Sequence, residues 1–342
     1  MKTKQYGFTL VELLVTLVIT MTALLVIGEV QIQTEQVRRT NQGNQSAQYS
    51  GLMAAQLIDQ GIKKTGFGLN DVTFIGSTIN YYSPANSAFE TETISPALIT
   101  TDGNNVKLRL MWATSNANMV PLKLLNTKLS TTTTVQVSNT YGMAVGDLLM
   151  YAEAGKDASV HQISAITPAN EEVVHTISST YPWNRDMATY YPTDNYTTDA
   201  RVINLGRWER QEFSIVSNQL WLKRTDANGS TSSLLADNIV RFQALYGLDN
   251  GAYSGEADDG VPDEFVATTP TNATTWARVV AVRFVVLARN AEKERAVVTT
   301  GNPAWSGGTF DLTGTTDWNK YRYRVYEATV PIRNAVWTVP AA

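Results

Sequence analysis

The sequence predicts an α+β protein in which a long amino-terminal helix packs on a mainly antiparallel β globular head. Residues 8–28 are apolar or Thr throughout, apart from Glu12. No proline occurs before Pro84, so nothing obliges a helix that begins near residue 8 to end early. Beyond Gly66, short alternating segments are separated by loops rich in Thr, Ser, Asn and Gly, which is the pattern of strands and turns.

The apolar run at residues 8–28 is long enough to cross a membrane as a transmembrane helix. As a helix it spans about 31 Å, the thickness of a bilayer's hydrocarbon core. Lys2 and Lys4 precede it and Glu29 follows it, so the positive-inside rule places the amino terminus in the cytoplasm. A secretory signal would have a shorter apolar stretch and a small-x-small cleavage site. A plain signal anchor explains everything except Glu12, because a carboxylate at the membrane centre costs about 2.5–3.5 kcal/mol, and less near the interface.

Residues 29–65 continue the helix as an amphipathic segment. Its polar face is set by Gln, Thr, Glu, Arg and Asn side chains. An apolar stripe at helical spacing predicts the face that lies on the head, and it consists of Leu52, Ala55, Ile58 and Ile62. Gly43 and Gly51 weaken the middle of the helix and allow a bend. Lys63, Lys64 and Gly66 predict its carboxyl end, with cations at the negative end of the dipole and a glycine cap.

The head at residues 66–342 is expected to be β-rich. Alternating or continuous apolar segments predict its strands, and these are 106–112, 215–222 around an Asn218-Gln219 turn, 240–246, 276–289 and 321–330. The intervening loops are expected at 127–133, 188–200, 249–275 and 299–319. Antiparallel sheet packed on one helix is an α+β arrangement.

Composition argues against most kinds of chemistry. The chain has no cysteine and two histidines, His161 and His175, which excludes thiolate sites and makes a histidine-based metal or catalytic site a poor candidate. The formal net charge is −4, so no global basic field is present and no direct nucleic-acid binding is expected. No nucleophile elbow, phosphate-binding loop or HExxH motif occurs. We therefore expect no enzyme activity and no cofactor.

The amino terminus carries a recognisable processing signal. A basic leader is followed by Gly7, Phe8, Thr9, Leu10 and then Glu12, an order that resembles the class III signal of type IV pilins and pseudopilins. The resemblance implies that residues 1–7 are a leader peptide, that a prepilin peptidase cuts between Gly7 and Phe8, and that it methylates Phe8. In that family the acidic residue pairs, inside the filament, with the amino terminus of a neighbouring subunit. We therefore expect Glu12 to act in assembly as a device that sets the register of adjacent subunits.

Three stretches near the carboxyl end extend the resemblance. They are LADNI at 235–239 with YGLD at 246–249, VRFVVLAR at 282–289, and YRYRVY at 321–326 running on to VPIRN at 330–334. Their order and spacing look like the PilW family of minor pilins. The chain departs from many major pilins because it cannot form a carboxyl-terminal disulfide loop and has Glu29 where they have proline. Both departures favour a low-copy subunit.

The resemblance implies a minor pilin in a tip or initiation complex, supporting adhesion, twitching motility or DNA uptake through the whole fibre. Its expected partners are the prepilin peptidase, other minor and major pilins, and the inner-membrane pilus assembly machinery. Before assembly the chain would be single-pass in the bacterial inner membrane with its head in the periplasm, and afterwards it would lie in the pilus at the cell surface. Two alternatives remain open: a J-like minor pseudopilin of a type II secretion system, and a membrane-anchored surface enzyme or binding module.

An acidic loop provides the remaining candidate site. Clustered carboxylates with glycines can bind Ca²⁺ through oxygen ligands, although the spacing here is not that of an EF-hand. The candidate ligands are Asp249, Asp258, Asp259 and Asp263. A solvated turn is the simpler interpretation of this loop.

Overall fold

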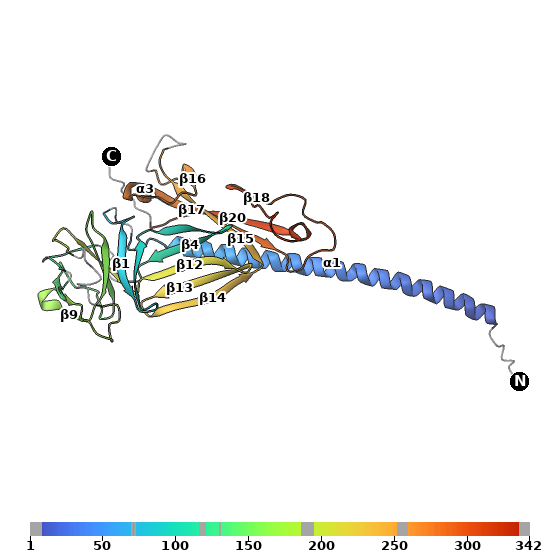
Figure 1. Cartoon of the computed structure of the whole chain (residues 1–342), viewed down its shortest axis with the longest axis horizontal. Coiled ribbons are helices and arrows are strands. Elements are labelled where there is room, and N and C mark those ends of the chain that lie inside the picture. The colour runs from blue at the N-terminus through green and yellow to red at the C-terminus, as the bar shows by residue number, and fades with distance from the viewer. Residues whose placement is uncertain are drawn as a thin grey trace.

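The computed structural model describes residues 9–69, 71, 73–115, 121–129, 131–185, 195–251 and 259–334. A long helix projects from one end of a β-rich head and runs into it (Figure 1). The helix and the mainly antiparallel sheets confirm the α+β class predicted from the sequence.

Helix α1 comprises Leu10–Lys64, 55 residues, and is therefore about 82 Å long. Thr9 is its amino-terminal cap and Thr65 its carboxyl-terminal cap. Gly66 follows with φ +80°, a left-handed conformation that glycine adopts without steric cost. The predicted end of the helix is thereby confirmed. The first buried residue of α1 is Ala47, so more than half of the helix lies outside the core.

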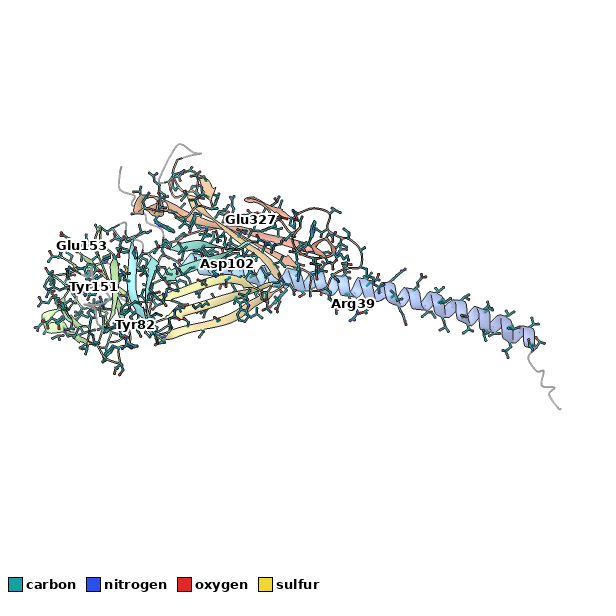
Figure 2. All side chains as sticks on the ribbon, viewed as in Figure 1. Arg39, Tyr82, Asp102, Tyr151, Glu153 and Glu327 are labelled. Carbon is teal, nitrogen blue, oxygen red and sulfur yellow. The ribbon has the colours of Figure 1, made fainter. Side chains whose placement is uncertain are left out.

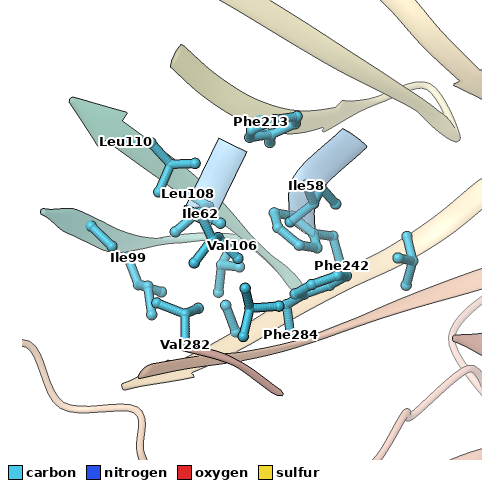
Figure 3. Packing of buried hydrophobic residues seen from close by; sticks show 14 of the residues in the cluster. Ile58, Ile62, Ile99, Val106, Leu108, Leu110, Phe213, Phe242, Val282 and Phe284 are labelled. Atoms are coloured by element: carbon cyan, nitrogen blue, oxygen red, sulfur yellow. The ribbon is translucent and has the colours of Figure 1, made fainter. Parts of the chain in front are cut away.

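Two antiparallel sheets enclose the carboxyl-terminal part of α1, and we call them the helix-bound sheets. The five-stranded sheet has the order β14 (Gly229–Asp237), β13 (Gln219–Asp226), β12 (Glu209–Val216), β4 (Asn105–Trp112), β3 (Ala97–Asp102). The four-stranded sheet has the order β16 (Glu264–Val266), β15 (Ile239–Leu248), β17 (Val279–Arg289), β20 (Tyr323–Pro331). Ile58 and Ile62 of α1 lie between them, among Phe213, Phe242 and Phe284 in one shared core (Figure 3).

The far end of the head holds two further sheets, the distal sheets (Figure 1). The six-stranded sheet has the order β2 (Ala88–Thr93), β1 (Thr78–Ser83), β8 (Ala158–Gln162), β7 (Leu148–Ala152), β11 (Arg201–Gly206), β5 (Leu122–Lys123). The three-stranded sheet has the order β6 (Thr134–Gln136), β10 (Glu172–Val174), β9 (Ala165–Thr167). Strands β4 and β12 pair directly, so the chain leaves the five-stranded sheet between them to build most of the distal part.

Glycines in α1 permit close packing of the helix against the head. The helix is continuous through Gly43 and Gly51. A Cβ at position 51 would overlap the Tyr326 ring of β20, and one at Gly61 would lie 2.9 Å from Leu110 of β4. The buried face accordingly runs through Ala47, Gly51, Ala54, Ile58, Gly61 and Ile62. The predicted stripe was wrong at Leu52, which is exposed, because small residues and not Leu set the contact.

Two local predictions for the strands need correction. The turn between β12 and β13 consists of Ser217 and Asn218, with φ +52° and +61°, and Gln219 already pairs with Val216. Positive φ at both central residues is what a two-residue hairpin requires, and it places the turn one residue earlier than predicted. The expected strand at 276–289 begins at Val279, because Trp276 belongs to a short helix, α3 (Ala273–Ala277), capped by Asn272.

A buried arginine joins the helix-bound and distal sheets. Arg210 of β12 lies over the rings of Trp208 and Tyr81, at 4.4 and 4.8 Å. Its Nη1 donates to Glu92 of β2 at 3.0 Å and also to the Tyr81 hydroxyl. Burial raises the pKa of Tyr81 well above its usual range, so the hydroxyl keeps its proton. A stacked, paired guanidinium of this kind fixes the two parts of the head against each other.

Candidate functional site: the amino-terminal helix and its neck

Glu12 closes the first turn of α1 together with Thr9. The Glu12 carboxylate accepts hydrogen bonds at Oε2 from the Thr9 main-chain N–H and from the Thr9 hydroxyl, both at 3.1 Å. In return, the Glu12 main-chain N–H donates to the Thr9 hydroxyl at 3.3 Å. This reciprocal arrangement is a capping box, and it satisfies polar groups that a helix start would otherwise leave unpaired. Gly7 and Phe8, the predicted processing residues, lie outside the described residues.

The apolar side chains in the stretch of α1 that follows Glu12 are exposed. Among the described residues, one helix is long and apolar enough to cross a membrane. It is α1, and no residue of its most apolar stretch is buried. Side chains such as Leu10, Leu17 and Leu25 are exposed. Such a contiguous apolar surface is far larger than soluble monomers expose, so it requires a lipid or protein surrounding.

The threonines within this stretch are compatible with an apolar surrounding. Thr16 donates its hydroxyl proton to the Glu12 carbonyl at 2.6 Å, and Thr20 donates to the Thr16 carbonyl at 2.7 Å. Thr22 bonds in the same way to the carbonyls of Val18 and Ile19. Each hydroxyl is therefore satisfied by its own helix and needs no water.

The helix leaves the head at a neck where residues 290–296, the neck loop, lie against it. Arg39 Nη1 lies 3.6 Å from Glu292 Oε2, and the Thr40 hydroxyl donates to Glu294 at 3.2 Å. A Cβ at Gly43 would lie 3.1 Å from the Asn290 Cβ. Figure 2 labels Arg39 at this exit point. Next to these contacts, a cavity of about 710 Å³ lies between the neck loop and residues 28–40 of α1.

The other end of the buried helix is capped by the chain's carboxyl-terminal segment. Asn334 Nδ2 donates to the Thr65 carbonyl at 3.1 Å and approaches the Lys64 carbonyl at 3.4 Å. These are carbonyls that the end of a helix leaves without an intrahelical donor. Asn334 belongs to the VPIRN stretch quoted from the sequence, but its contact with the helix could not be foreseen from position alone.

The carboxylates of the acidic loop accept hydrogen bonds from main-chain N–H groups of the same loop. Asp249 Oδ2 accepts from the Gly260 N–H at 2.6 Å, and Asp263 Oδ2 accepts from the N–H groups of Asn250 and Gly251 at 2.8 and 2.6 Å. Asp259 Oδ1 accepts from Val261 at 2.8 Å, and Asp258 lies outside the described residues. Within the described ranges no group of three or more metal-ligating side chains is placed to hold a metal ion. Calcium binding by this loop gains no support from the described part of the chain.

Comparison with protein-family models separates two regions of the chain. Residues 2–28 match the prokaryotic N-terminal methylation motif. Residues 210–334 match Type IV Pilus-assembly protein W. Together the two matches support a type IV pilin-like protein of the PilW family. No curated protein and no solved structure matches it.

The two matches fall on the parts of the chain that carry its pilin-like architecture. The first covers the processing signal and the exposed apolar start of α1. The second covers β12 through β20 and Asn334, the elements that hold the buried end of α1. Every strand of the distal sheets lies outside both matches. PilW and pilin families are structural proteins, and the apolar amino-terminal helix is consistent with a membrane-anchored pilin that interacts with pilus assembly components and other pilins.

Proposed function

We propose that this protein is a minor, low-copy type IV pilin that acts in a tip or initiation complex with other minor pilins. The observation that carries the proposal is the exposed apolar helix of a pilin-like chain whose start is closed by Thr9 and Glu12. The distal sheets support a low-copy role, because they extend the head beyond the helix-bound part, and such a head is awkward to repeat along a thin shaft. Adhesion, twitching motility or DNA uptake would then be properties of the assembled fibre.

Maturation would begin in the inner membrane, with the head in the periplasm. A prepilin peptidase would cut between Gly7 and Phe8 and methylate the new amino terminus at Phe8. Cleavage removes Lys2 and Lys4, the cations that hold the amino terminus on the cytoplasmic side. The pilus assembly machinery would then extract α1 from the bilayer into the growing fibre.

Glu12 would pair with the Phe8 amine of a neighbouring subunit. Both hydrogen bonds from Thr9 end on Oε2, and no hydrogen bond from a described residue ends on Oε1. A carboxylate can accept about four hydrogen bonds, so the capping box and an incoming amine are compatible. In an apolar bundle the two charges are satisfied only when adjacent helices have the correct axial offset. The pair would therefore select one register.

The test compares Glu12→Leu with Glu29→Leu, which removes an acidic residue of the same helix just beyond the apolar run. Fibres are counted by electron microscopy in cells that express each variant in place of the native chain, and surface incorporation is measured by immunoblot of sheared fibres. The proposal predicts loss of incorporation with Glu12→Leu and near-normal incorporation with Glu29→Leu. Normal incorporation of Glu12→Leu would contradict the pairing.

A further inference from the structure

The cavity at the neck has a chemically mixed lining. Its walls are residues of α1 from Gly28 to Thr40 on one side and the neck loop on the other. Three cations line it, and so do three carboxylates, so its formal charge is 3 − 3 = 0; the six residues are Arg39, Lys293, Arg295, Glu35, Glu292 and Glu294. A cavity for a simple anion would carry an excess of cations. Balanced charge instead suits a ligand that bears both signs.

Several of the lining charges already have partners outside the cavity lining: Arg38 binds Glu35 at 2.8 Å, and Arg322 binds Glu294 at 2.9 Å. Arg39 contacts Glu35 at 3.1 Å and Glu292 at 3.6 Å. Lys293 is held by Asp317 at 2.8 Å. Arg295 is exposed and forms no ion pair within the described part of the chain. A long guanidinium side chain at the rim of the cavity is therefore available to a ligand.

The cavity begins where the apolar run ends. Gly28, the last residue of that run, lines the end of the cavity that is farthest from Thr40. The exposed side chain of Ile32, one helical turn nearer to Thr40, supplies an apolar wall. No atom lies within 4 Å of a Cβ built on Gly28, so this stretch of helix surface is open. If residues 8–28 occupy the bilayer core, the end of the cavity nearest Gly28 lies at the level of the lipid headgroups. Lipid tails could then continue along the same helix face.

We propose that the neck cavity binds the headgroup of a zwitterionic phospholipid of the phosphatidylethanolamine kind. Arg295 would contact the phosphate and Glu292 the ammonium, while the acyl chains lie along α1 on the amino-terminal side of Gly28. The proposal rests on the proposed function insofar as α1 is held in a membrane before assembly. A bound lipid would brace the neck loop against the helix, and extraction into a fibre would have to release it.

The experiment measures lipid adducts on the purified full-length chain in detergent by native mass spectrometry. The probes are phosphatidylethanolamine, phosphatidylglycerol and diacylglycerol with identical acyl chains, with inorganic phosphate as the free-anion arm. Ala296→Trp fills the cavity, and Val297→Trp is the matched control, because Val297 is exposed and does not line it. Arg295→Gln removes one cation and is expected to weaken phosphatidylethanolamine binding about fivefold. Thermal unfolding of each variant verifies that the head is folded.

The expected result is a preference for phosphatidylethanolamine over the other three probes, lost in Ala296→Trp and kept in Val297→Trp. Equal adducts with diacylglycerol, or a preference for phosphatidylglycerol or inorganic phosphate, would overturn the proposal. So would unchanged selectivity in a folded Ala296→Trp chain. If selectivity is absent while the chain is still processed and incorporated into fibres, this inference alone fails. If the chain is not processed, the pilin proposal fails whatever the lipid result.

Discussion

Thr9 and Glu12 form reciprocal hydrogen bonds. The Thr9 N–H and hydroxyl both donate to the Glu12 carboxylate, and the Glu12 N–H donates to the Thr9 hydroxyl. The acidic residue of the processing signal therefore has a partner within its own helix. In a subunit that is not yet assembled, the capping box lessens the cost of placing this carboxylate near a membrane. Assembly would add an intermolecular partner without breaking the local one.

Thr9→Val is expected to loosen the first turn of α1 without abolishing assembly. Valine keeps the shape of threonine but has no hydroxyl, so Glu12 loses one donor and its own N–H loses an acceptor. Loss of such a cap costs about 1 kcal/mol. Hydrogen exchange at the amides of residues 10–13, measured on the full chain in detergent micelles, should accelerate about fivefold. Thr22→Val is the control, because its hydroxyl bonds to carbonyls of its own helix; equal acceleration at these amides in both variants would exclude a specific cap.

Gly51→Ala is expected to destabilise the packing of α1 on β20. The new methyl group would overlap the Tyr326 ring, and overpacking of this kind costs about 1–3 kcal/mol. Urea unfolding of the full chain in detergent measures the loss. Gly301→Ala is the matched control, because nothing lies within 4 Å of its Cβ position. Gly51→Ala should cost less in a Tyr326→Ala background than in the native chain, and an equal cost in both would refute the steric explanation.

Asn334→Ala is expected to free the carboxyl-terminal end of α1. The variant removes the donor to the Thr65 carbonyl, and the expected cost is about 1 kcal/mol. The same urea titration reports it, and Asn41→Ala on the exposed face of α1 serves as the control. If both variants unfold at the same urea concentration as the native chain, the hydrogen bond seen here does not stabilise the helix end.

The titration of Glu35 tests the charges at the neck. Hydrogen bonds from Arg38 and then Arg39 lower the pKa of Glu35 from 4.5 to about 2. Because the folded pKa is depressed, any stabilisation by this group is present above pH 4.5 and is lost as the pH falls toward 2. Glu35 lies on an exposed part of the helix, so little change in overall stability is expected. The carboxyl ¹³C shift of Glu35 should move below pH 3 in the native chain and near 4.5 in an Arg38→Gln, Arg39→Gln chain; a native midpoint near 4.5 would contradict the contacts.

Local signals predicted the parts of the fold whose causes are local. The end of α1 follows from Lys63, Lys64 and Gly66. Strands β4, β15 and β20 were visible as alternating or apolar segments. The exposed apolar helix and its acidic residue, which form the candidate site, were predicted for the same reason.

Features that depend on distant segments were not predictable from the sequence. Gly51 allows the Tyr326 ring to lie against α1, and this contact involves a residue distant in the sequence. The contact determines which face of α1 is buried and leaves Leu52 exposed, although helical spacing predicted Leu52 in the core. The neck cavity likewise requires the neck loop to fold back onto Arg39 and Thr40. Trp276 continued an apolar run in the sequence, but capping by Asn272 placed it in a helix.

The amino-terminal mass of the protein purified from cells with and without the prepilin peptidase tests the central claim most directly. The account predicts a chain that begins at N-methylated Phe8 when the peptidase is present and at Met1 when it is absent. A Gly7→Leu chain should remain uncut in both strains, which assigns the cut to this site. An intact Met1 start in both strains would contradict the account and favour an anchored surface module.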